Sequence, residues 1–283
     1  MKRTTAILPL LLVLLVVAGI GAVQAESRIV AFCGSASKPA MEEAARSYEA
    51  KTGTKVELLF GGSGTMLAQM KLARKGDVYI PGSPDFMEIA EKQGLVDPAT
   101  RRILAYLVPA INVQPGNPKN IRVLADLAKP GIRVGIGNPE SVCVGLYAVE
   151  ILDRAGLLKE VQPNIITHAP SCDATEALVS LKKVDAVIGW DVFPKWNPGR
   201  MEAVFLKPDQ LPRLAYIPAA VSSFTKERGL AVGFIDFLAS KDGQAIFAKW
   251  GYLSSETEAR KLAPNAGIGG TYTLPDHYAP ARR

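Results

Sequence analysis

The sequence predicts an α/β protein built as two lobes that are connected by two crossings of the chain. Short β-like runs alternate with longer helical patterns, which is typical of parallel strands covered by helices. Two apolar stretches interrupt this alternation, ILAYLVPAINV at 103–113 and AYIPAAV at 215–221, and their prolines lie about 110 residues apart. A chain that leaves one lobe, builds a second and returns would cross in this way, and the lobes could then close by hinge motion. A single doubly wound domain is the alternative.

The elements of each lobe follow from this alternation in order. The first lobe is expected to comprise residues 26–108 and 217–283, and the second residues 109–216. In the first lobe we expect strands at 28–32, 56–60 and 76–80 and helices at 39–51, 65–74, 84–93, 229–239 and 243–250. In the second, strands are expected at 133–136, 165–168 and 185–190, and helices at 145–155 and 174–183.

The amino-terminal residues predict export. Lys2 and Arg3 precede an apolar run that ends in Val23-Gln24-Ala25, and this pattern is typical of a signal peptide, here residues 1–25. An uncleaved anchor is the alternative, because the run approaches the length of a membrane span. We therefore expect a soluble exported chain in the periplasm.

The composition narrows the classes of partner. Hydrophobic residues make up 48% and charged residues 21% of the chain, as in globular proteins. The net charge of +6 favours the capture of anions. Dense Lys/Arg runs and interleaved stacking aromatics are absent from the sequence, so a nucleic-acid partner is not expected. We expect a monomer.

Four loops that each follow a strand and open a helix share one composition of small and hydroxyl-bearing residues. They are CGSAS (33–37), GGSG (61–64), NPESVCVG (138–145) and APSCD (169–173). A helix N-terminus presents N–H groups without partners and about half a positive charge, so it suits an oxyanion. Helix capping is the alternative for any single loop. The sequence lacks a phosphate-binding Lys loop and a G-x-G-x-x-G after a strand, which disfavours a nucleotide ligand.

Several segments resemble the periplasmic molybdate-binding proteins. SKPAMEEAARSYEAKTGTKVELLFGGSGTMLAQM and GDVYIPGSPDFMEIAEKQGLV are similar to the first lobe of that family, and GIRVGIGNPESVCVGLYAVEILDRAGL and VSLKKVDAVIGWD to its second. The resemblance covers most of residues 29–191. It implies a two-lobed type II periplasmic-binding-protein fold with two hinge crossings. It also implies capture of molybdate or tungstate for the permease and ATPase of an ABC importer, with no cofactor and no catalysis.

The same resemblance indicates which residues hold the anion, through hydroxyl and backbone N–H groups. Ser63 matches the family's serine in the second loop, whereas either Ser35 or Ser37 must serve in the first. Asp191 lies where the family often has a tyrosine or an acid. The remaining expected ligand-binding residues lie in the glycine turn and in the second lobe: Gly62, Ser141, Val142, Cys143 and Ser171.

The cysteines depart from the family pattern. Cys33, Cys143 and Cys172 each lie in one of the four loops. An exported chain usually pairs its cysteines, which suggests a Cys143–Cys172 disulfide, although all three could be small packing residues. A third interpretation is a cluster of all three thiols that binds a soft ion such as Cu(I) or trivalent arsenic. A catalytic thiol fits least, because neither His168 nor His277 has an obvious cysteine partner.

Overall fold

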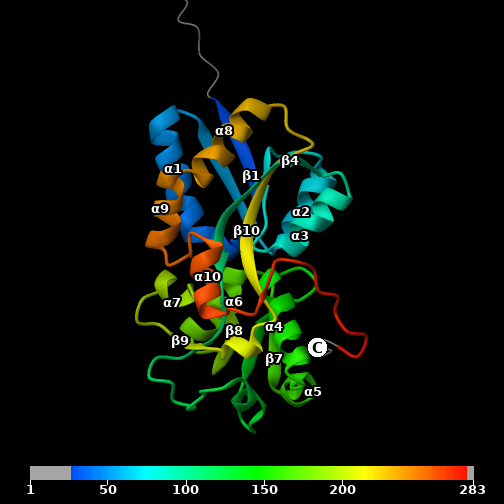
Figure 1. The fold of residues 1–283 in the computed structure, drawn as a ribbon, viewed down its shortest axis with the longest axis vertical. Coiled ribbons are helices and arrows are strands. Elements are labelled where there is room, and N and C mark those ends of the chain that lie inside the picture. The colour runs from blue at the N-terminus through cyan, green and yellow to red at the C-terminus, as the bar shows by residue number, and fades with distance from the viewer. Residues whose placement is uncertain (1–26, 279–283) are drawn as a thin grey trace, which may run out of the picture.

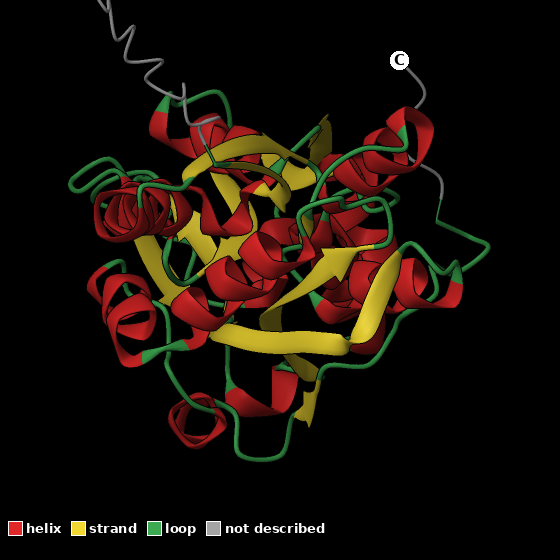
Figure 2. Ribbon diagram, turned by 90° about the horizontal axis from the view of Figure 1, so that it is seen from above, coloured by secondary structure: helices red, strands yellow, loops and turns green. Residues whose placement is uncertain are grey.

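The computed structural model describes residues 27–278, which form two β-sheets with helices on their faces. Figure 1 shows the two lobes one above the other, with the long strand β10 running between them. Seen from above, helices flank the strands on both sides (Figure 2). No helix within residues 27–278 is long and apolar enough to cross a membrane, and the expected signal peptide lies outside the described residues.

The sheet of the first lobe has the strand order β11-β10-β3-β1-β2, and β4 also pairs with β10. Its strands are β1 (Arg28–Gly34), β2 (Lys55–Gly61), β3 (Val78–Ile80), β4 (Val96–Leu107), β10 (Arg213–Ser222) and β11 (Gly267–Ile268). The helices that follow these strands are η1 (Ser35–Ser37), α1 (Lys38–Thr52), α2 (Ser63–Ala73), α3 (Pro84–Lys92), α8 (Arg228–Ala239) and α9 (Lys241–Lys249). Since β1 is parallel to both β2 and β3, the loops after these strands emerge at one edge.

The sheet of the second lobe has the order β7-β6-β8-β5-β9. Its strands are β5 (Pro109–Val113), β6 (Val134–Gly137), β7 (Ile165–Ala169), β8 (Ala186–Trp190) and β9 (Glu202–Phe205). Its helices are η2 (Leu124–Ala128), α4 (Cys143–Arg154), α5 (Leu158–Val161), η3 (Gln162–Asn164), α6 (Cys172–Ser180), α7 (Phe193–Trp196) and η4 (Pro208–Gln210). The loops after the parallel strands β6 and β7 face the first lobe.

The two crossings lie side by side. The stretch expected as one crossing, 103–113, is divided into β4 and β5, which meet at Val108. On the returning crossing, Ala215 of β10 is paired with Leu107 of β4 in an antiparallel register. Two paired strands therefore connect the lobes.

Two apolar clusters form the core, and they do not follow the expected division along the chain. Within the stretch 217–283, α8 and α9 belong to a cluster that lies under the first sheet and extends into the second lobe, where it includes Tyr147 and Trp190. Helix α10 (Glu256–Leu262) instead packs with the second lobe. Ala259 of α10 and Ala263, the residue that follows the helix, lie with Ile111 and Ile188 in the second cluster. This part of the chain therefore differs from the expected assignment to the first lobe, because its small apolar face fits against the second.

Candidate ligand site between the lobes

Five loops from the two lobes meet at the boundary between them. The N–H of Gly64, at the start of α2, donates to the carbonyl oxygen of Ser141 at 2.8 Å. The Lys38 ammonium, at the start of α1, lies 3.1 Å from the carboxylate of Asp173 in α6. The lobes are thus in direct contact through helix N-termini, where unpaired N–H groups concentrate.

Ser35 is the first-loop serine that reaches the second lobe. Its Oγ accepts hydrogen bonds from the N–H groups of Cys172 at 3.0 Å and Asp173 at 3.2 Å. Ser37 is equally buried, but its hydroxyl turns back to the Gly34 carbonyl oxygen at 3.5 Å. The structure therefore separates the two candidates that the sequence left open.

Ser63 connects two loops of the first lobe. Its Oγ accepts the N–H of Gly82 at 3.0 Å, and its carbonyl oxygen accepts the hydroxyl of Tyr79 at 2.9 Å. Gly82 belongs to a fifth loop, Pro81-Gly82-Ser83 between β3 and α3, which was not among the expected site residues. Its signal was present in the sequence, since this loop, like the other four, combines Ser with Gly or Pro.

The glycines of these loops allow the lobes to approach closely. A Cβ on Gly62 would lie 2.8 Å from the carbonyl oxygens of Ser141 and Pro170, and one on Gly82 would lie 2.6 Å from Cys143 Sγ. These distances are shorter than any ordinary van der Waals contact. The glycine turn at 61–64 therefore also allows the second lobe to approach the backbone of the first.

Two of the expected residues in the second lobe serve local structure, and a third contacts the first lobe. The Val142 N–H donates to the Asn138 carbonyl oxygen at 2.7 Å, which closes the turn before α4. Ser171 is the N-cap of α6, since its Oγ accepts the N–H of Ala174 at 3.2 Å. Ser141 contributes its carbonyl oxygen, which holds Gly64. These contacts position the loops against the first lobe.

The three cysteines are thiols, and only two of them are close together. Cys143 and Cys172 begin α4 and α6, and their Sγ atoms lie 3.4 Å apart. The Cys33 thiol is buried in β1 and donates to the Ala31 carbonyl oxygen at 3.6 Å. Among residues 27–278, no group of three or more His, Cys, Asp or Glu side chains is placed to hold a metal ion. In the structure Cys143 and Cys172 lie together, whereas Cys33 has its own partner in β1.

Burial governs the ionisation of these thiols. It raises the pKa of Cys33 and, together with the neighbouring Cys172, raises the pKa of Cys143 well above its usual value, although a hydrogen bond with Ser63 acts in the opposite direction. Both groups are therefore protonated thiols near neutral pH.

Asp191 follows β8 and is hydrogen-bonded to the first crossing, where β4 and β5 meet. Its carboxylate accepts the N–H of Val108 at 3.1 Å, and its own N–H donates to the Val108 carbonyl oxygen at 2.9 Å. Burial raises the pKa of Asp191 to about 7. The structure thus places this carboxyl group on the crossing between β4 and β5.

The profile of the bacterial extracellular solute-binding proteins matches residues 29–253. This chain belongs to that family. Its relatives include the molybdate-binding protein of Escherichia coli, which is 25% identical over 80% of this chain and 89% of its own length. The sulfate-binding protein of Synechococcus elongatus is 27% identical over 82% of this chain and 74% of its own length.

The fold of this solute-binding protein is that of the type II periplasmic binding proteins, as expected. The periplasmic molybdate-binding protein of Azotobacter vinelandii superposes with a TM-score of 0.71 at 20% identity, over 82% of this chain and all of that one. The sulfate-binding protein of Mycobacterium tuberculosis superposes with a TM-score of 0.70 at 19% identity, over 86% and 93% of the two chains. The fold is therefore common to proteins named for different tetrahedral anions.

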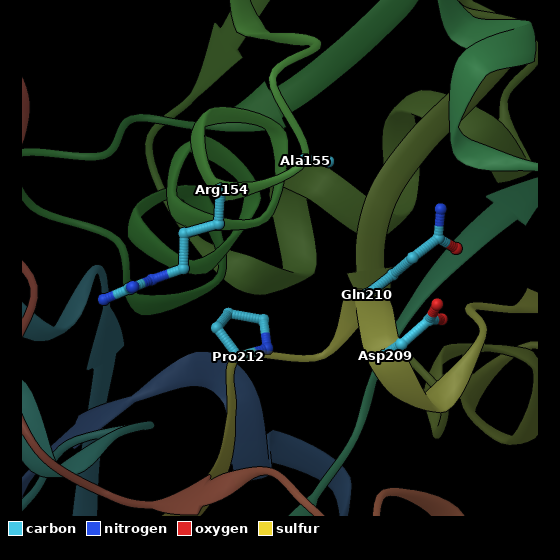
Figure 3. Close-up of a pocket in the computed structure, with 5 residues that line it drawn as sticks. All are labelled: Arg154, Ala155, Asp209, Gln210 and Pro212. Atoms are coloured by element: carbon cyan, nitrogen blue, oxygen red, sulfur yellow. The ribbon is translucent and has the colours of Figure 1, made fainter.

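Two surface pockets of this solute-binding protein lie at different distances from the contact between the lobes. A pocket of about 250 Å³ between Arg154, Asp209 and Pro212 lies at the C-terminal end of α4 (Figure 3), and a helix of this length places it about 17 Å from the end that meets the first lobe. A groove of about 310 Å³ lined by Gly64 and Glu140 instead lies beside the contact between the lobes.

Proposed function

We propose that this chain is an exported solute-binding protein that captures a tetrahedral oxyanion, molybdate or tungstate, between its lobes. Its partners are then the permease and ATPase of an ABC importer, to which a periplasmic monomer delivers the anion. Binding involves no turnover, because hydroxyl and N–H groups can hold an oxyanion without any covalent step.

The observation that supports this proposal most is the contact of Ser35 with the start of α6. The N–H groups of Cys172 and Asp173 both point at the Ser35 oxygen. An oxygen of an anion can take the same place as acceptor, and the hydroxyl of Ser35 would then become a further donor. The positive end of α6 adds about half a charge at this point.

Ser63 and Gly82 offer a second set of the same kind. Here too an N–H group donates to a serine oxygen, at 3.0 Å, next to the start of a helix. These donors are all neutral, and they come from several loops. A tetrahedral anion has four acceptor oxygens in different directions, so donors that converge from different loops suit it better than a single cation does.

The choice of molybdate or tungstate over sulfate rests on the resemblance of the loops to the molybdate-binding proteins. The relatives include proteins named for molybdate and for sulfate. Direct comparison of the three anions is therefore part of the test.

Opening and closing would use the paired crossings. We propose that residues 26–108 with α8 and α9 move against residues 109–216 with α10, about the point where Val108 passes between the lobes. Opening would separate Ser35 from α6 and Gly64 from Ser141, which exposes the donors to the anion. Such hinge closure is the usual way in which two-lobed binding proteins enclose a ligand.

Isothermal titration of the purified protein with molybdate, tungstate and sulfate tests the proposal. We expect saturable 1:1 binding of molybdate and tungstate. Ser35→Ala and Ser63→Ala should each weaken it by roughly 10- to 150-fold, which corresponds to about 1.5–3 kcal/mol for a hydrogen bond to a charged group. Ser37→Ala is the matched control, since the Ser37 hydroxyl bonds only within its own turn. Tight binding of sulfate alone would refute the molybdate assignment, and no binding of any of the three would refute the function.

A further inference from the structure

The Cys143 and Cys172 thiols form a pair with a distinct position in the candidate site. Both are buried, and their Sγ atoms lie 3.4 Å apart. Each is the first residue of its helix, α4 or α6. Because both belong to the second lobe, the pair stays together when the lobes separate.

The thiol pair shares its surroundings with the hydrogen-bond donors described above. The Cys172 N–H donates to Ser35 Oγ at 3.0 Å. The Cys143 thiol is hydrogen-bonded to Ser63, and its sulfur lies close to the backbone of Gly82. A ligand held between these serines would therefore lie beside the thiol pair.

We propose that this thiol pair covalently binds a trivalent, thiophilic oxyacid of the arsenous acid class within the site assigned above to oxyanions. The inference rests on the proposed function, since it uses the same loops and the same donors. Each thiol replaces one hydroxyl group of As(OH)₃. Two S–As bonds form and two As–O bonds break. Each thiol proton leaves with a hydroxyl group as water, and arsenic remains trivalent.

The separation of the two sulfurs fits a single bridging atom. Two bonds to sulfur of ~2.3 Å at a right angle span about 3.3 Å, close to the observed 3.4 Å. A disulfide requires an S–S distance of about 2.05 Å. A tetrahedral metal requires further ligands, and among residues 27–278 no group of three metal-ligating side chains is present. Two soft sulfur ligands without a third favour a small thiophilic centre that keeps one oxygen of its own.

The charges of the site fit the same class of ligand. Arsenous acid is neutral near pH 7, and its exchange with two thiol groups releases only water. No net charge is therefore buried, which avoids the large penalty for burying an ion. The remaining hydroxyl group of arsenic would lie among the donors at Ser35, Ser63 and Gly82.

Titration of arsenite into the protein, reduced with a phosphine that carries no thiol, tests this proposal. We expect 1:1 binding and a mass increase equal to As(OH)₃ less two waters. Cys143→Ser and Cys172→Ser should each weaken binding by about 100-fold or more, whereas Cys33→Ser is the matched control and should retain it. Thermal melting shows whether each variant is folded, and alanine variants at the same positions replace any that is not.

Parallel titration with molybdate separates this proposal from the proposed function. Molybdate binding without arsenite binding would overturn the thiol proposal and leave the oxyanion function in place. Arsenite binding that is unchanged in both serine variants of the pair would also overturn it, as would a Cys143–Cys172 disulfide that resists the reductant. If neither ligand binds, the proposed function fails as well.

Discussion

Arg213 pairs with two buried carboxylates that belong to different lobes. Its Nη2 lies 2.9 Å from Asp85 of α3, and its Nε lies 2.5 Å from Glu150 of α4. All three residues are 5% exposed or less. Although burial disfavours its charge, the pKa of Arg213 is held above the usual range by Tyr147, Asp85 and Glu150. The guanidinium therefore stabilises the closed arrangement of the two lobes at the start of β10.

Arg213→Met would leave Asp85 buried without a cation and Glu150 with only the exposed Arg154 as its partner. Removing one partner of a buried ion pair costs about 3–5 kcal/mol, and methionine retains most of the apolar stem. In a chain of this size each 1 kcal/mol lowers the Tm by roughly 2–4 °C. We therefore expect the Tm to fall by about 6–20 °C.

Arg154→Met is a matched control because Arg154 pairs with the same Glu150. Its Nε lies 3.1 Å from Glu150 Oε1, but the Arg154 side chain is 60% exposed. Because the Arg154 cation is exposed to solvent, we expect this pair to contribute about 0–1 kcal/mol, as surface pairs do. The two variants therefore remove the same kind of side chain from one carboxylate and differ in burial.

Urea unfolding and thermal melting at pH 7 measure both variants. Equal losses of stability for Arg213→Met and Arg154→Met would refute the reasoning, because burial would then have no effect. A triple variant that adds Asp85→Asn and Glu150→Gln to Arg213→Met should recover much of the stability, since no unpaired charge remains buried. Failure to recover would show that packing, and not charge, explains the loss.

Two further predictions concern the crossing and the glycine turn. Burial raises the pKa of Asp191 to about 7, whereas an unfolded aspartate has a pKa of about 4. Protonation of Asp191 therefore stabilises the folded state. This stabilisation is complete below about pH 4 and is lost as the pH rises through 7. Asp191→Asn can still accept the Val108 N–H, so in urea unfolding its free energy of unfolding should rise relative to that of wild type as the pH increases from about 4 to 7. A difference between the two proteins that does not change with pH would contradict this. Gly62→Ala should oppose closure, since its Cβ would lie 2.8 Å from the Ser141 carbonyl oxygen, and should weaken molybdate binding by about tenfold or more. Gly229→Ala, with open space around it, is the control, and equal affinities of the two variants would exclude this role.

The regular elements of the first lobe could be predicted because their signals are local. A continuous apolar run gives β1, and Pro39 in the first turn of α1 marks a helix start. The start of α4 could not be placed in this way, since Gly145 suggested the first residue of the helix. In the structure Gly145 lies inside the first turn, and a Cβ there would lie 2.0 Å from the Gly137 carbonyl oxygen. This glycine is required by the packing of α4 on β6, which only the tertiary structure shows.

The types of residue in the candidate site could be predicted from sequence, but the contacts between them could not. Hydroxyl-bearing residues at helix starts identify the loops from sequence alone. Which serine faces the other lobe depends on the direction of a single side chain, and Ser35 and Ser37 are indistinguishable by composition. The part played by Gly82 depends on the parallel placement of β3 beside β1, which brings a fifth loop next to the other four.

The three cysteines show how backbone position changes the chemistry of one residue type. Cys33 lies within β1, where its buried thiol donates to the Ala31 carbonyl oxygen. Cys143 and Cys172 are also buried but begin helices, so each contributes both a thiol and a helix N-terminus to the contact between the lobes. Hydrogen-bond donors at such termini suit the oxygens of a ligand, and paired thiols suit a soft central atom. An oxyacid with a thiophilic centre satisfies both sets at once, whereas a hard oxyanion such as sulfate uses only the first. The ratio of arsenite to sulfate affinity therefore reports directly on how much the thiol pair contributes to recognition.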